Sequence, residues 1–444
     1  MSQHPTPSEL GVLLAGGLTP LREQEVLRHL FSCESCRACL KGRNFPQKDS
    51  RAEKISPDLE AAYERVLDSG LRIARYLDRE TEQARRIAAL LQEGGAFAIF
   101  SKGDTPLGGF GVYKALIERC WAVRLHQPQQ MVSLARCALE VALRLGPEEF
   151  SPRQRGDLIA QAWGALGNAF RAADNLVEAE RAFNEAFSVF ERQGSGDSAV
   201  KARLYTLLAS LHGTRRIFTL AFAALDVAYT LYNEIGDRHS AGHTLLKKAI
   251  YTHYSGQSEE AIKINRKALA LIDLNREPDL LIIALHNELS FLVACGHFGE
   301  ARRTLFKYRP HLPNMGKIHT LKLRWLEGQI DYGLRNLQSA EAAFLEARQG
   351  FEEEDLGIAA AMASLDLGLV RMRQHRTREA GRIATEAAQI FTSLQVPVQA
   401  IAAVLLLRDS FEWGKATLAL YESVVEFVRK SDIDPDAQFI PPDV

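Results

Sequence analysis

The stretch AWGALGNAFRAADNLVEAERAFNEAF, residues 162–187, decides the fold that we predict for this chain. Its apolar residues recur every three to four positions, first over one segment and then over a second, which indicates two helices joined by a short turn. Two antiparallel helices need small residues where their backbones approach and large residues in the gap between them. Gly167 and Ala179 supply the small residues, and Trp163 and Phe183 supply the large ones. We therefore expect a closely packed helical hairpin here.

The second-helix half of this pattern recurs along the chain. It consists of an alanine, a usually apolar residue four positions later, and usually an alanine three positions after that. After Ala179/Phe183/Ala186, the matches are Ala221/Leu225/Ala228, Ala261/Asn265/Ala268, Ala301/Leu305/Tyr308, Ala340/Phe344/Ala347 and Ala380/Ala384/Ala387. The steps between the first alanines are 42, 40, 40, 39 and 40 residues. Such constant spacing is typical of a repeat array.

These hairpins resemble the tetratricopeptide (TPR) repeat, whose helix-turn-helix unit has about 34 residues. The resemblance implies an all-α, right-handed TPR-like helical solenoid. The longer period here corresponds to roughly 9 Å of additional helix per repeat. Asn265, Tyr308 and Ala384 depart from the residue types that the pattern prefers.

The composition excludes several other classes of protein. The chain of 444 residues has 54 Lys and Arg against 55 Asp and Glu, so no net field favours direct nucleic-acid or membrane binding. No apolar run reaches the about 20 residues that a bilayer requires. The N-terminus MSQHPTPSELG also lacks the basic and apolar regions of a secretory signal. We therefore expect a cytoplasmic protein.

A motif near the N-terminus indicates metal binding. In HLFSCESC, His29, Cys33 and Cys36 have the spacing H-x3-C-x2-C. Thr19-Pro20 suits a helix start, and that helix would present His29 at its end. Clustered cysteines in a reducing compartment point to metal or redox chemistry and not to disulfides. A structural zinc site requires four Cys or His ligands.

Extended to His4, the pattern His4-x24-His29-x3-Cys33-x2-Cys36 resembles the zinc-binding anti-sigma factor domain, over residues 3–42. The resemblance implies a small helical zinc-binding module with two His and two Cys ligands, one structural Zn²⁺ per chain, and a sigma factor of RNA polymerase as partner. Cys39 is an alternative fourth ligand. A reduced helical stripe of cysteines without metal, and a redox switch with Cys39 as resolving thiol, are the other interpretations of the cluster.

The sequence thus predicts six regions. They are a zinc-binding module (1–42), a linker (43–56), a helical part with degenerate repeats (57–155), TPR-like repeats of about 40 residues (156–395), C-terminal capping helices (396–432) and a disordered tail (433–444).

Stacked hairpins create an extended recognition surface. In TPR proteins, residues of the first helices line the binding groove. The resemblance projects that role onto a mixed set of amide, cationic and aromatic side chains. The set is Asn168, Arg171, His253, His286, Lys322, Gln329 and Tyr332. Such a mixture suits a protein or peptide segment.

No catalytic motif accompanies these features. The chain has no GxSxG, HExxH, Walker or GxGxxG motif in a fitting context, so we do not expect an enzyme. Two functions remain open. The first is a scaffold or regulatory adaptor in bacterial signalling whose solenoid binds a protein or peptide. The second is a soluble, anti-sigma-like transcription regulator that sequesters a sigma factor through its zinc module.

Overall fold

The computed structural model describes residues 4–6, 9, 22, 26, 29, 33, 81–89, 109–124, 127–147, 150–309, 316–394, 396–433 and 437–442. The chain divides into two compact units, residues 1–119 and residues 120–444. In the first unit, residues 81–89 form a helix with Ile87 fully buried. Helix α6 (Phe110–Val123) crosses the boundary between the two units. The six predicted regions remain predictions.

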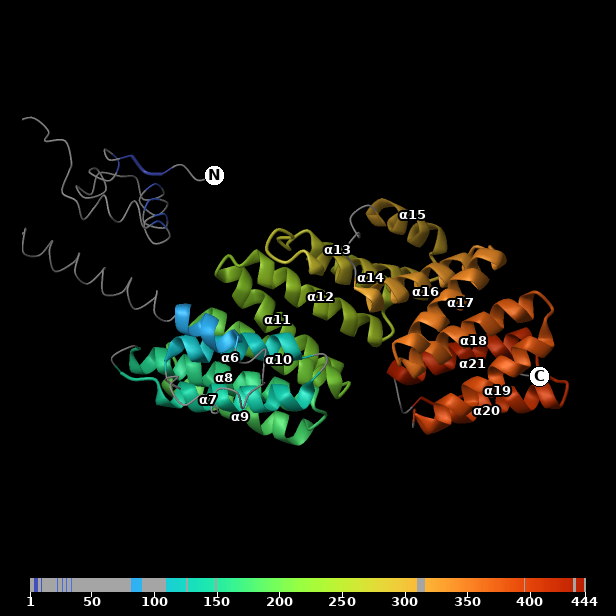
Figure 1. Ribbon diagram of the computed structural model, residues 1–444, viewed down its shortest axis with the longest axis horizontal. Coiled ribbons are helices and arrows are strands. Elements are labelled where there is room, and N and C mark those ends of the chain that lie inside the picture. The colour runs from blue at the N-terminus through green and yellow to red at the C-terminus, as the bar shows by residue number, and fades with distance from the viewer. Residues whose placement is uncertain are drawn as a thin grey trace, which may run out of the picture. The chain divides into compact units, whose positions relative to one another are not determined.

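The second unit is a series of helical hairpins that follow α7 (Figure 1). The helices are α7 (Pro128–Arg144), then the pairs α8 (Pro152–Ala172) and α9 (Leu176–Gln193), α10 (Ser198–Thr214) and α11 (Phe218–Glu234), α12 (Arg238–Tyr254) and α13 (Ser258–Leu269), α14 (Asp279–Ala294) and α15 (Phe298–Tyr308), α16 (Lys317–Gly333) and α17 (Leu337–Glu353), α18 (Gly357–Arg373) and α19 (Thr377–Ser393), α20 (Val398–Glu412) and α21 (Leu418–Ile433). The described part of the chain contains no strand. The prediction of an all-α, TPR-like repeat fold is confirmed.

The turn inside each hairpin is set by one residue with a left-handed backbone. Gly256 and Gly296 take this conformation after α12 and α14, with φ of 85° and 74°, which glycine adopts without steric cost. In the hairpin at residues 162–187 a non-glycine residue does the same, since Asp174 has φ of 59°. Asn175 follows it and accepts a hydrogen bond from the Glu178 backbone N–H, which caps α9.

Small residues set the close approach of the two helices, as the sequence indicated. A Cβ placed on Gly167 of α8 would lie 3.0 Å from the ring of Phe183 of α9. The same relationship recurs two hairpins before the end of the chain, between Gly328 of α16 and Phe344 of α17. Phe183 and Phe344 are each only 1% exposed. Each aromatic ring therefore occupies the space that a missing side chain leaves on the facing helix.

The two helices of a hairpin take different places in the array. The second helix of a pair packs against its own first helix and against the next first helix, as α11 does with α10 and α12. Successive first helices also contact one another, as α8 with α10, and α14 with both α12 and α16. We call the surface on which the first helices meet the inner face.

The last hairpin departs from this order. Helix α20 packs against α19, whereas α21 packs against both α20 and α18, a first helix (Figure 1). The ring of Tyr421 from α21 is fully buried in the core that α18–α21 form. Beyond α21, the side chain of Phe439 lies against Phe427, with ring centroids 5.0 Å apart. The final helix thus lies along the inner-face helix of the preceding pair.

None of the helices among the described residues combines the length and the apolar character that crossing a membrane would require.

Candidate functional site

The predicted groove residues lie on four first helices of the second unit. Asn168 and Arg171 belong to α8, His253 to α12 and His286 to α14. Lys322, Gln329 and Tyr332 belong to α16. The structure brings them into separate clusters along the array.

The first cluster joins α8 to α10 and α12. The Arg171 guanidinium donates from Nε to Asn168 Oδ1 at 3.0 Å and from Nη1 to Thr214 Oγ1 at 3.3 Å. Burial lowers the pKa of Arg171. The Lys247 ammonium of α12 donates to Ser210 Oγ at 2.6 Å. Arg171 and Lys247 are therefore both held by neutral oxygen atoms.

Lys247 was not among the residues predicted from the TPR resemblance. Burial, together with the positive charge of Arg171, lowers its pKa to about 8. Tyr251, one helical turn later on α12, lies close to the same groups, and burial raises its pKa while Arg171 lowers it. The sequence signal that could have found this cluster is the absence of Asp and Glu from both α10 and α12.

His253 has a structural environment. Its Nδ1 lies 2.8 Å from Ser258 Oγ, across the turn that joins α12 to α13. Its ring is 4.8 Å from the ring of Phe291 of α14. Burial lowers the pKa of His253. These contacts bind the imidazole to the turn and to the next hairpin.

His286 of α14 lies near Lys322 and His319 of α16. The side chain of His286 is half-buried on α14, whereas Lys322 and His319 are exposed. Burial, together with the charges of Lys322 and His319, lowers the pKa of His286 to about 4. At neutral pH the imidazole of His286 is therefore uncharged.

Gln329 and Trp325 of α16 bind an aspartate of the neighbouring first helix. Trp325 donates from Nε1 to Asp366 Oδ2 at 2.7 Å, and Gln329 donates from Nε2 to the same atom at 3.0 Å. Asp366 of α18 is almost completely buried, and its other oxygen pairs with Arg429 of α21. The amide of Gln329 is thus engaged within the chain.

Tyr332 is engaged in the same way. Its hydroxyl donates to Glu422 Oε1 of α21 at 3.0 Å, and Arg373 of α18 stacks over its ring at 4.3 Å. Arg373 also donates to Glu422 at 2.7 Å. Helix α21 therefore covers the inner face where Tyr332 and Gln329 lie. Among the described helices, α21 packs against α18 and α20, and it does not pack against α8, α10, α12 or α14.

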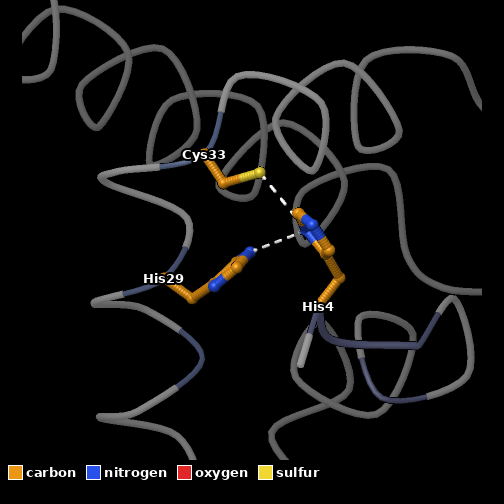
Figure 2. Close-up of side chains that lie close together, drawn as sticks. All are labelled: His4, His29 and Cys33. Carbon is orange, nitrogen blue, oxygen red and sulfur yellow. Dashed lines mark hydrogen bonds between the residues drawn. The ribbon is translucent and has the colours of Figure 1, made fainter. Parts of the chain in front are cut away.

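Three of the predicted metal ligands meet in the first unit (Figure 2). His4 Nδ1 lies 3.1 Å from His29 Nε2 and 3.4 Å from Cys33 Sγ. The three ligand atoms all lie within 4.8 Å of one another. His4 is exposed, while His29 and Cys33 are half-buried. Cys36 and Cys39 lie outside the described residues.

Two of these distances are close to those in a zinc site. With Zn–N of about 2.0–2.1 Å and Zn–S of about 2.3 Å, two ligand atoms of a tetrahedral site lie about 3.3–3.6 Å apart. The two short distances from His4 Nδ1 are close to that range, and the donor set of imidazole and thiol is one that zinc prefers. The cluster could therefore supply three of the four ligands of a structural site.

The described residues do not form a catalytic constellation that we can identify. A shallow hollow of ≈ 610 Å³ lies beside α8 and α9, bounded by Pro152, Arg153 and residues 190–196, and no histidine or cysteine lines it. Burial raises the pKa of Cys295 to about 11, which opposes a reactive thiolate beside His297. We identify binding groups on the inner face, and no nucleophile with its base.

Comparison with known proteins identifies solved structures that share the fold of this chain. No protein family and no curated protein matches the sequence. Among solved structures, a Rap protein complexed with competence and sporulation factor is similar, with a TM-score of 0.52 and 13% identity over 72% of this chain and 87% of that one. The apo form of RapI is similar at a TM-score of 0.52 and 12% identity, covering 72% of this chain and 98% of that one. This chain therefore has the helical-repeat fold that these Rap proteins share.

Proposed function

We propose that the chain is a regulatory adaptor or scaffold of bacterial signalling that binds a protein or peptide segment on its inner face. It acts in the cytoplasm and is not an enzyme. The observation that supports this function is the set of polar and cationic side chains on α8, α12 and α14, which lie where α21 does not cover the first helices. The similar Rap protein was solved with competence and sporulation factor bound, so a fold of this kind can hold a second molecule.

Photo-crosslinking in the native host tests this proposal. A photoreactive amino acid replaces His243, which is exposed on the first helix α12, or Leu220, which is 49% exposed on the second helix α11. We expect the position on α12 to capture a discrete partner and the position on α11 to capture none. Capture from Leu220 alone would contradict binding on the inner face.

We also propose that His4, His29, Cys33 and Cys36 hold one structural Zn²⁺. Four protein ligands leave no open position for a water nucleophile, so the metal would connect the N-terminal residues around His4 to the His29–Cys33 segment. Metal binding supplies folding free energy to modules too small to make a sufficient core.

The His4–His29–Cys33 cluster favours a second candidate function, in which the zinc module sequesters a sigma factor of RNA polymerase. The support is the match of these ligands to the anti-sigma pattern, together with their proximity in the structure. Affinity purification of the zinc-replete protein from its host tests this function. We expect a sigma factor to co-purify and to be lost when Cys33 is replaced by Ser. Recovery of no sigma factor under zinc-replete conditions removes this function and leaves the adaptor role intact.

A further inference from the structure

Positive charge is concentrated on two neighbouring first helices of an otherwise neutral chain. The whole sequence has a net charge of −1. Helices α10 and α12 contain no Asp or Glu. Their Lys and Arg residues are Lys201, Arg203, Arg238, Lys247 and Lys248. Lys248 pairs with Asp226 of the second helix α11, so it does not add to the charge of the inner face, whereas Lys247 contacts the first helix α10.

Two cations of this region have no carboxylate partner among the described residues. Arg171 contacts Asn168 and Thr214, and Lys247 contacts Ser210 and the backbone carbonyl of Thr206. Elsewhere in the array, arginines are paired with acids, as Arg266 is with Glu288 and Glu300 at 2.8 Å and 2.6 Å. A partly buried cation without a counter-charge is costly.

The two cations lie near each other, because Arg171 contacts Thr214 and Lys247 contacts Ser210, one turn away on α10. They repel each other, and the charge of Arg171 contributes to the lowered pKa of Lys247. An anion bound between them would relieve this repulsion and the missing counter-charge together. The groups around them are hydrogen-bond donors as well. The Tyr251 hydroxyl and the Asn168 amide lie in the same cluster, and both can donate to a carboxylate.

We infer that Arg171 and Lys247, with Tyr251 and Asn168 beside them, form a carboxylate-binding site on the inner face, and that its ligand is an acidic peptide segment. This inference rests on the proposed function, because it names the chemical class of the segment that the inner face binds. The carboxylate comes from a Glu or Asp side chain or from the peptide's own C-terminus.

A polyanion such as nucleic acid fits the site less well. Nucleic acid requires a basic surface that follows many phosphates. The second helices next to the site are acidic or mixed, and α9 alone contains Glu178, Glu180, Glu185 and Glu191. A compact pair of cations between such helices matches one or two carboxylates.

The test uses the full-length protein and a display library of random seven-residue peptides. We expect the wild-type protein to enrich peptides with an excess of Asp and Glu. Enrichment without that excess would overturn the carboxylate site while leaving peptide binding in place. No enrichment from the library would contradict both proposals.

One selected acidic peptide is then measured by fluorescence anisotropy against variants. We expect Arg171→Gln and Lys247→Gln each to weaken binding about tenfold or more, because each removes a charge-assisted hydrogen bond. Lys247→Arg keeps the charge and retains most of the affinity. Lys248→Gln is the matched control, since Lys248 pairs with Asp226 of α11, and we expect it to leave binding unchanged.

Two further measurements keep the inference falsifiable if a variant folds poorly. Raising KCl from about 50 to about 500 mM should weaken wild-type binding. An amidated version of the peptide separates the two sources of the carboxylate, because it binds normally only where side chains supply the charge. Equal binding of the all-Gln version of the peptide, or equal competition by single-stranded DNA, would overturn the assignment.

Discussion

Tyr421 lies directly against Gly368, so closely that a Cβ on residue 368 would overlap the phenol ring. Gly368 belongs to α18 and Tyr421 to α21. The ring is fully buried, and burial raises the pKa of its hydroxyl well above the usual value. The absence of a side chain at residue 368 therefore allows the last helix to lie on the inner face.

We predict that Gly368→Ala loosens α21. The added methyl group cannot fit without moving Tyr421, and overpacking of this kind costs about 1–3 kcal/mol. Hydrogen exchange measured by mass spectrometry should show faster exchange in α21 and α18, and little change in α8–α13. Gly299→Ala is the control, because the nearest atom to its new Cβ is 4.0 Å away, at the end of the flexible Arg303 side chain. Unchanged exchange in α21 would contradict the packing argument.

Asp366 is predicted to be the polar link between α16, α18 and α21. Asp366→Asn removes the charge that pairs with Arg429 and weakens the bonds from Trp325 and Gln329. We expect the free energy of unfolding to fall by about 1–3 kcal/mol. The loss stays in this range because Arg429 is only partly buried. Unfolding by denaturant exposes Trp325 and shifts its fluorescence to the red. In the variant this shift should occur at a lower denaturant concentration than in the wild type.

Glu353→Gln is the matched control for Asp366. Glu353 pairs with Lys317 on the surface at 3.3 Å, and both side chains are about half exposed. We expect a change below about 1 kcal/mol. Equal effects of the two substitutions would show that Asp366 has no special role.

His286 should make the stability of the array depend on pH. Its pKa is lowered from 6.5 to about 4, so between these values the unfolded chain binds a proton that the folded chain does not. The stability that neutral His286 contributes to the folded chain is therefore fully present above pH 6.5, and it is lost as the pH falls toward 4. Between pH 7 and pH 4.5, the free energy of unfolding should fall in both proteins. We expect the fall to be about 1–3 kcal/mol smaller for His286→Gln than for the wild type. Parallel pH profiles from thermal unfolding would contradict this.

Metal content tests the N-terminal ligand set. We expect about one zinc per purified chain, and none after Cys33→Ser together with Cys36→Ser, because each replacement removes a thiolate ligand. Cys295→Ser, which lies in the repeats, should keep the zinc. Comparison of His4→Ala with Cys39→Ser identifies the fourth ligand. Stoichiometric zinc in the double variant would show that the ligand set is wrong.

The hairpins could be predicted from the sequence because their determinants are local. Gly167, Ala179 and Phe183 lie within one repeat, and the spacing of the alanines reports the period. Asn265 looked like a departure from the pattern, yet its amide donates to the Ala284 carbonyl at 2.9 Å in the next hairpin. The side-chain nitrogen of a polar residue at a core position thus finds a partner that the repeat pattern does not specify.

The binding face could be predicted only in part. Arg171 and Asn168 followed from the TPR resemblance, but Lys247 comes near them from a hairpin about 80 residues away. Tyr332 and Glu422 are 90 residues apart in sequence, and no periodicity relates them. The pattern shows which helix a residue belongs to, but it cannot show that the final helix returns along an earlier one.

The position of α21 also limits how this protein could have grown during evolution. A solenoid usually lengthens when a duplicated repeat is added to an open end. Here Tyr421, Val424 and Val428 of α21 are buried in the core that this helix forms with α18, α19 and α20, and α21 packs on the first helix α18 where the regular order would place α20. A copy of a regular hairpin therefore matches the surfaces between existing hairpins better than it matches the irregular pair α20–α21.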